Sequence, residues 1–145
     1  MLAFDDRTVW AVHHTQGEFD YRLVAENNKP FQPDEAPLPD FRAAGKENAT
    51  KYHWSVALSM RPRAMVRADK ALLLGGTPPV APGEDPYAVY EGRKGGLLWV
   101  MAADGGAKLA EIRLASPPVW DGMAVTGGRV YLSACDGSVS CLGAP

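Results

Sequence analysis

The chain alternates short apolar runs with turn-forming residues, most clearly in its last third. Residues 129–134 place apolar side chains at every second position, which is typical of a β-strand with one buried face. Residues 138–142 alternate in the same way, and Asp136-Gly137 between them favours a tight hairpin turn. Together with the apolar run 123–126 and the turn Gly127-Gly128, this region predicts a three-stranded antiparallel meander.

Similar segments recur along the rest of the chain. Apolar or alternating runs bounded by turn residues predict further strands at residues 2–4, 8–12, 19–24, 53–58, 63–67, 71–74, 97–103 and 108–114. No long segment has the periodicity of an amphipathic helix. The sequence therefore predicts the all-β class.

Two long stretches interrupt this pattern of strands. Residues 27–51 are rich in proline and charge, and residues 77–96 form a second expected loop. In the second loop, Pro86 stands at the first position of a single expected helical turn within 85–92. Loops of this length are uncommon in compact domains and often carry function. Both stretches are therefore candidate recognition loops.

The two cysteines, Cys135 and Cys141, lie on either side of the expected turn at Asp136-Gly137. A two-residue turn places Cys141 opposite Leu132 and Cys135 opposite Ser138. The two thiols then do not face each other, which disfavours a disulfide. The cysteines accordingly do not indicate a redox compartment.

Two segments suggest an internal repeat. Residues 64–74 and 123–132 share the order short strand, tight turn, second strand, and they begin about 60 residues apart. Without the second long loop, this spacing approaches the ~40–50 residues of a β-propeller blade, which is a four-stranded antiparallel sheet.

The same residues carry a family resemblance. Leu98–Ala110 resembles the strand-turn-strand core of pyrroloquinoline-quinone-type repeats, and Asp121–Gly143 resembles the final strands of such a propeller. With Trp54–Gly76, the chain is similar to the C-terminal end of large secreted quinoprotein-like repeat proteins, common in planctomycete bacteria. One departure is Ala110, which stands where the repeat carries a docking tryptophan.

The resemblance implies a partial β-propeller of about three blade equivalents, each an antiparallel four-stranded sheet. Residues 1–145 would form one unit, with the best-defined blades at 52–76 plus 95–114 and at 119–143. A complete propeller needs at least four blades. The expected partners are therefore the remaining blades of a longer chain, or further copies of this one.

The expected function is a non-catalytic propeller module, a scaffold or interaction surface for a protein or carbohydrate ligand in an extracytoplasmic protein. One alternative is part of a quinone-dependent dehydrogenase, which would need a cavity for the quinone and a bound calcium ion. Another alternative is a small carbohydrate-binding β domain. No set of residues for the quinone is recognisable, so no cofactor is expected.

The composition argues against several other classes of function. The chain is 46% hydrophobic and 22% charged, as in ordinary globular domains. Its net charge is −2 and its basic residues are scattered, which argues against nucleic-acid binding. No apolar run approaches the ~20 residues that cross a bilayer. Residues 1–6 lack the basic and apolar regions of an export signal, so no targeting signal is expected in this chain.

Residues with catalytic or metal-binding chemistry do not form a recognisable set. His13 and His14 are adjacent on an expected strand and point to opposite faces, and His53 stands alone. No nucleophile elbow, phosphate loop or dinucleotide motif is present. The acidic residues are expected in solvated turns, as the pairs Asp5-Asp6, Asp34-Glu35 and Glu84-Asp85 and as the single residues Asp69, Asp104, Asp121 and Asp136.

Glycine pairs and tryptophans are the remaining conspicuous features. Turn chemistry explains the pairs Gly75-Gly76, Gly95-Gly96, Gly105-Gly106 and Gly127-Gly128. Packing between blades is expected for Trp10, Trp54, Trp99 and Trp120. The sequence therefore predicts no catalytic, cofactor-binding or metal-binding residues.

Overall fold

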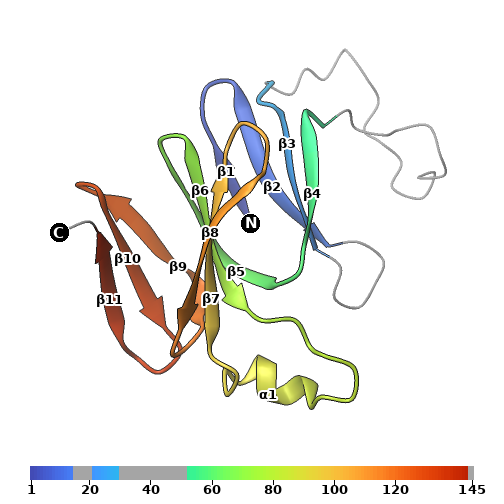
Figure 1. Cartoon of the computed structure of the whole chain (residues 1–145). Coiled ribbons are helices and arrows are strands. Elements are labelled where there is room, and N and C mark those ends of the chain that lie inside the picture. The colour runs from blue at the N-terminus through green and yellow to red at the C-terminus, as the bar shows by residue number, and fades with distance from the viewer. Residues whose placement is uncertain (15–20, 30–51, 144–145) are drawn as a thin grey trace.

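The computed structural model describes residues 1–14, 21–29 and 52–143, and it is all-β, as the sequence predicts (Figure 1). The strands form three antiparallel sheets, and within each sheet the strands follow one another in chain order. Neighbouring strands of one sheet are thus consecutive in the chain and antiparallel, and no strand crosses over another.

The first sheet contains β1 (Leu2–Phe4), β2 (Thr8–His14), β3 (Tyr21–Asn27) and β4 (Trp54–Leu58). The second contains β5 (Arg61–Ala68), β6 (Ala71–Thr77), β7 (Gly96–Ala102) and β8 (Lys108–Leu114), with the short helix α1 (Pro86–Tyr90) between β6 and β7. The third contains β9 (Pro118–Thr126), β10 (Arg129–Ala134) and β11 (Val139–Gly143).

The boundary between the first two sheets differs from the sequence-based division. The sequence predicts that residues 52–76 and 95–114 form one blade. In the structure, β4 pairs with β3, with Val56 opposite Leu23, so β4 completes the first sheet. Only Ser59 and Met60 separate β4 from β5. A local pattern cannot reveal this division, because the strands on both sides of the link are apolar.

The two segments of the internal repeat occupy equivalent places. Residues 64–74 form the hairpin of β5 and β6, and residues 123–132 belong to the hairpin of β9 and β10. Each hairpin is the first of its sheet.

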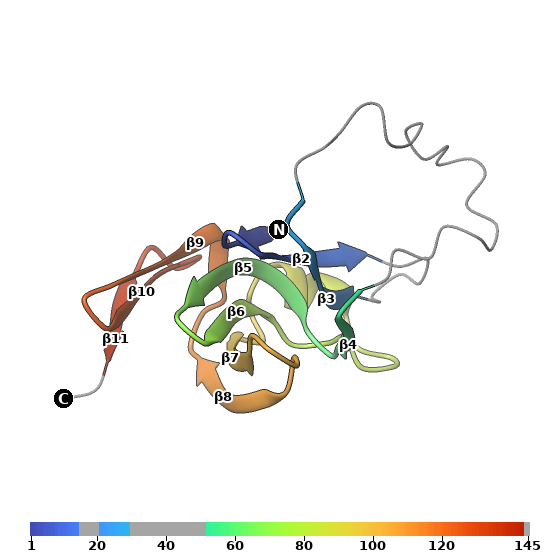
Figure 2. The same ribbon diagram turned by 90° about the horizontal axis from the view of Figure 1, so that it is seen from above.

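The three sheets approach one another through their first strands. The backbone of β5 lies close to both β1 and β9. Figure 2 shows these three strands gathered together, whereas the last strands of the sheets, β4, β8 and β11, lie far apart. The sheets therefore diverge from their first strands outward.

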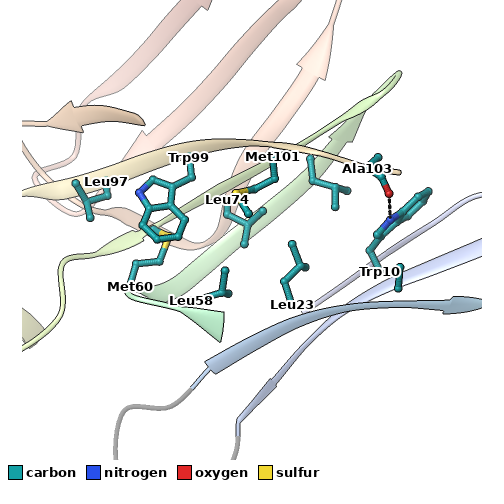
Figure 3. Close-up of a cluster of buried hydrophobic side chains, with 11 residues drawn as sticks. Trp10, Leu23, Leu58, Met60, Leu74, Leu97, Trp99, Met101 and Ala103 are labelled. Carbon is teal, nitrogen blue, oxygen red and sulfur yellow. Dashed lines mark hydrogen bonds between the residues drawn. The ribbon is translucent and has the colours of Figure 1, made fainter. Parts of the chain in front are cut away.

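A hydrophobic core fills the space between the first and second sheets (Figure 3). Leu23 from the first sheet and Leu72 and Leu74 from the second are completely buried in it. The indole Nε1 of Trp10 donates a hydrogen bond of 2.9 Å to the carbonyl oxygen of Ala103, so a polar contact also joins the two sheets.

Glycines permit the close packing of the second and third sheets. A Cβ atom on Gly75 would stand 2.9 Å from Pro118 and 3.1 Å from Met123, and one on Gly96 would stand 2.6 Å from Pro117. Gly75-Gly76 and Gly96 lie within β6 and β7, so their interpretation as turns is wrong. The absence of a side chain serves packing there.

The register of the last hairpin also differs from the expected one. Cys141 lies opposite Tyr131 rather than Leu132, because the turn runs from Ala134 to Ser138 and is longer than two residues. Both cysteines are free thiols.

Within the described ranges, no helix is long and apolar enough to cross a membrane.

Candidate functional site

A small cavity lies where the link between β4 and β5 meets the loop that carries α1. Its volume is about 40 Å³. The lining residues come from the ends of β4, β5 and β6, from the link, from the start of the loop and from α1: Leu58, Ser59, Met60, Arg61, Thr77, Pro78, Pro79, Val80, Val89 and Tyr90. The expected recognition loop at 77–96 thus supplies six of the ten lining residues.

Two polar side chains of this wall have atoms without hydrogen-bond partners. Thr77 is completely buried, and its Oγ1 and the buried Nε of Arg61 have no partner in the described part of the chain. The guanidinium of Arg61 lies 3.9 Å from the centre of the Tyr90 ring and donates to the Tyr90 hydroxyl. An unpartnered buried polar group is costly, and both atoms lie within the wall, out of reach of the open space of the cavity.

A β-bulge next to the cavity aims a second arginine at the same loop. The pairing of β5 with β6 shifts between Pro62 and Ala64, which leaves Arg63 as the extra residue. Arg63 is only 7% exposed. It donates to the Tyr90 carbonyl oxygen at 2.7 Å and contacts the Cys135 sulfur at 3.1 Å. Neither partner is a carboxylate.

Acidic side chains of the α1 loop form ion pairs with basic side chains of the same loop. Asp85 caps the helix by accepting from the Tyr87 amide at 2.9 Å, and Arg93 contacts it at 3.0 Å. The hydrogen bond from Arg93 lowers the pKa of Asp85, and that from Lys94 lowers the pKa of Glu84. These acids thus pair with Arg93 and Lys94 and not with Arg61 or Arg63 of β5.

A second candidate site is the open cleft at the opposite end of the sheets. It holds both charge signs and is lined by Asp5, Thr8, Trp10, Arg67, Asp69, Lys70, Ala103 and Asp104. Arg67 bridges the first two sheets, because it lies 3.1 Å from the Asp5 carboxylate and 5.1 Å from the Trp10 ring. Hydrogen bonds from the amides of Arg7 and Thr8 lower the pKa of Asp5, and Arg67 lowers it further. Asp5 thus stabilises its own turn, and its ion pair with Arg67 joins the first two sheets.

The histidines are not brought together. His13 lies near Tyr52 and His14 near Tyr21, with ring centroids 5.9 and 5.1 Å apart, and the His53 Nε2 lies 3.0 Å from the Asn27 Oδ1. The part of the chain that the structure describes contains no group of three or more side chains suited to a metal ion. The acidic pair Asp34-Glu35 lies outside the described residues.

The tryptophans divide into two groups. Trp10 and Trp99 are buried between the first two sheets and Trp54 packs against the same core, as expected. Trp120 is 61% exposed, so its expected packing between sheets is wrong. It lies in the irregular part of β9, between the pairs Pro118–Ala134 and Met123–Leu132.

The residues of the small cavity were missed in the sequence. In the sequence, Arg61 and Arg63 belong only to the scattered basic residues. A proline inside a strand, opposite a glycine pair, is a known signal for a bulge and could have pointed to this place. The meeting of Arg61 with Thr77 and Tyr90 could not be found, since it depends on tertiary contacts.

No protein-family model and no curated protein sequence matches this chain.

Proposed function

We propose that this chain is a segment of a pyrroloquinoline-quinone-type β-propeller that acts as a scaffold or interaction module in an extracytoplasmic protein. The supporting observation is the stacking of consecutive meanders through their first strands β1, β5 and β9. Propeller blades are arranged in this way around a central axis. The resemblance of Leu98–Ala110 and Asp121–Gly143 to the repeat is the second support.

The outer faces of the stack are suited to packing against further blades. On β1, Leu2 and Phe4 alternate with Ala3, which packs against the core, so their largely exposed side chains point away from it. On the third sheet, Tyr131 and Val139 share the face opposite the buried Leu132, and Val139 is 70% exposed. Exposed apolar faces of this kind mark interaction surfaces.

The third sheet also offers an open strand edge. The first two sheets have four strands each, whereas within the described residues β11 pairs only with β10. An unpaired edge accepts a strand from another chain or another segment. The proposed partners are therefore the remaining blades of a longer protein, or a second copy of this chain.

Size-exclusion chromatography with light scattering tests this proposal. We expect the isolated chain to associate, with a mass that rises with concentration. The Val139→Lys variant should shift the mass toward that of a monomer, because it puts a charge on the outer face. As a control, Leu109→Lys changes a residue of β8 that is 62% exposed and should leave the association unchanged. A wild-type chain that stays monomeric and melts cooperatively would contradict the proposal.

A further inference from the structure

We propose that two copies of this chain pair antiparallel through the open edge of β11, so that their third sheets become one continuous sheet. This inference rests on the association proposed above and names the edge through which it occurs. Within the described residues, β11 has a neighbouring strand only on its β10 side, and it lies at the outer edge of the molecule (Figure 1). An unpaired strand edge is a template for a further strand.

The hairpin shows which backbone groups of this edge are free. The Ala134 amide donates to the Ser138 carbonyl oxygen at 2.9 Å, so the backbone groups of Ser138 face β10. Backbone groups alternate in direction along an antiparallel strand. Every second residue from Ser138 onward therefore faces β10, and the residues between them, Val139, Cys141 and Gly143, direct their amides and carbonyls outward.

The sequence of β11 is suited to pairing with itself. The strand runs from Val139 to Gly143 without a charged residue, so an identical strand beside it brings no like charges together. Full antiparallel overlap places Val139 opposite Gly143 of the partner subunit and Cys141 opposite the partner subunit's Cys141. The outward-facing residues then form hydrogen-bonded pairs about a two-fold axis. The outer strand of the second sheet, β8, instead carries three charged side chains, and charges protect an edge from such pairing.

Charges at the two ends of the last hairpin favour the same arrangement. Arg129 lies opposite Gly143, and a Cβ atom on Gly143 would stand 3.0 Å from the Arg129 Cγ, so the Arg129 side chain lies against the end of β11. Asp136 lies in the turn at the other end. Both are exposed, and within the described residues neither forms an ion pair. Antiparallel pairing brings Arg129 toward Asp136 of the partner subunit at both ends, which is an attraction that salt screens.

Charge reversal, followed by size-exclusion chromatography with light scattering, tests this arrangement. Arg129→Glu alone and Asp136→Lys alone each bring like charges together at both ends, so each should weaken association about two- to thirtyfold, because two surface ion pairs are lost. An equimolar mixture of these two variants should associate like the wild type, since both ends of the mixed dimer then join opposite charges. The controls Arg113→Glu on β8 and Asp104→Lys in the turn before β8 should also associate like the wild type.

A thiol cross-link tests the register independently of the charges. In the Cys135→Ser variant, Cys141 is the only thiol. The Cα atoms of directly opposed hydrogen-bonded residues lie about 5.5 Å apart. The reagent 1,2-ethanediyl bismethanethiosulfonate joins two thiols through an ethylene spacer and should therefore link two copies at Cys141. The Cys141→Ser variant keeps Cys135, which lies outside β11, and should not be linked.

The outcomes separate this inference from the proposed function. If the wild type associates and both charge variants and their mixture associate equally well, pairing through β11 is overturned while the interaction module stands. An associated Cys135→Ser variant without a cross-link overturns it too, and this is the result expected if the copies meet through β4, through β8 or through their exposed faces. A wild-type chain that stays monomeric contradicts both proposals.

Discussion

Gly76 is the residue on which the arginine-bearing bulge of β5 depends. It lies opposite Pro62, and a Cβ atom at this position would overlap the carbonyl oxygen of Arg61 and stand 2.9 Å from the Pro62 Cα. The backbone atoms that it would meet belong to a paired strand and cannot move aside cheaply. The positions of Arg61 and Arg63 in the bulge therefore require a glycine at residue 76.

Replacement of Gly76 by alanine should lower the free energy of unfolding by about 1–3 kcal/mol, as other overpacked sites do. The same replacement at Gly105, where a Cβ atom would meet nothing within 4 Å, should change it by no more than about 0.5 kcal/mol. Urea unfolding of the two variants measures both values. A Gly76→Ala variant as stable as Gly105→Ala would show that the bulge can relax.

At the scale of single elements, carboxylates hold the turns and the helix cap. Asp5 accepts from two amides of its own turn, Asp85 caps α1, and Asp136 accepts from the amide and the hydroxyl of Ser138. These bonds, and for Asp85 the bond from Arg93, keep the pKa of each carboxyl group below its usual value. The sequence predicts these acids in turns, because turn positions favour aspartate through local contacts alone.

Acid should therefore destabilise the fold. A group with a lowered pKa binds a proton more readily in the unfolded chain, so protons favour unfolding. The stability from Asp5, Asp85 and Asp136 is present above the usual value of 3.8 and is lost as the pH falls through the lower folded values. Urea unfolding at pH 6 and at about pH 3 measures the loss. Asp136→Asn keeps an acceptor in the turn and should lose less stability between these two pH values than the wild type.

Strand positions were predictable from local pattern, whereas their assignment to sheets was not. The run at 53–58 predicts a strand, and β4 occupies Trp54–Leu58. Its partner β3 ends 27 positions earlier in the sequence, at Asn27. Alternation indicates which face of a strand is apolar, but it does not say which other strand covers its edge.

At the scale of the whole molecule, a buried hydrogen bond joins the first two sheets inside their shared core. Trp10 and Trp99 are both buried in this core. The Trp10 indole donates to the Ala103 carbonyl, whereas the Trp99 Nε1 has no hydrogen-bond partner among the residues that the structure describes. The two tryptophans therefore form a matched pair for measuring what this contact contributes.

Trp10→Phe and Trp99→Phe remove a similar amount of buried ring. Trp10→Phe also leaves the Ala103 carbonyl without its donor. We expect Trp10→Phe to be less stable than Trp99→Phe by about 1–3 kcal/mol, the usual effect of an unsatisfied buried group. Thermal or urea unfolding measures the difference. Equal stabilities would indicate that water replaces the indole as donor.

The amino-acid sequence by itself determined the all-β class, the strand positions and the helical turn that begins at Pro86. These features follow from side-chain alternation and turn chemistry, which act over a few neighbouring residues. Only the tertiary structure decided the sheet to which β4 belongs, the packing role of Gly75 and Gly76, and the cavity of Arg61 and Thr77. Each of these depends on strand pairing, a bulge or contacts between residues far apart in the chain, and their geometry exists only once the sheets are stacked.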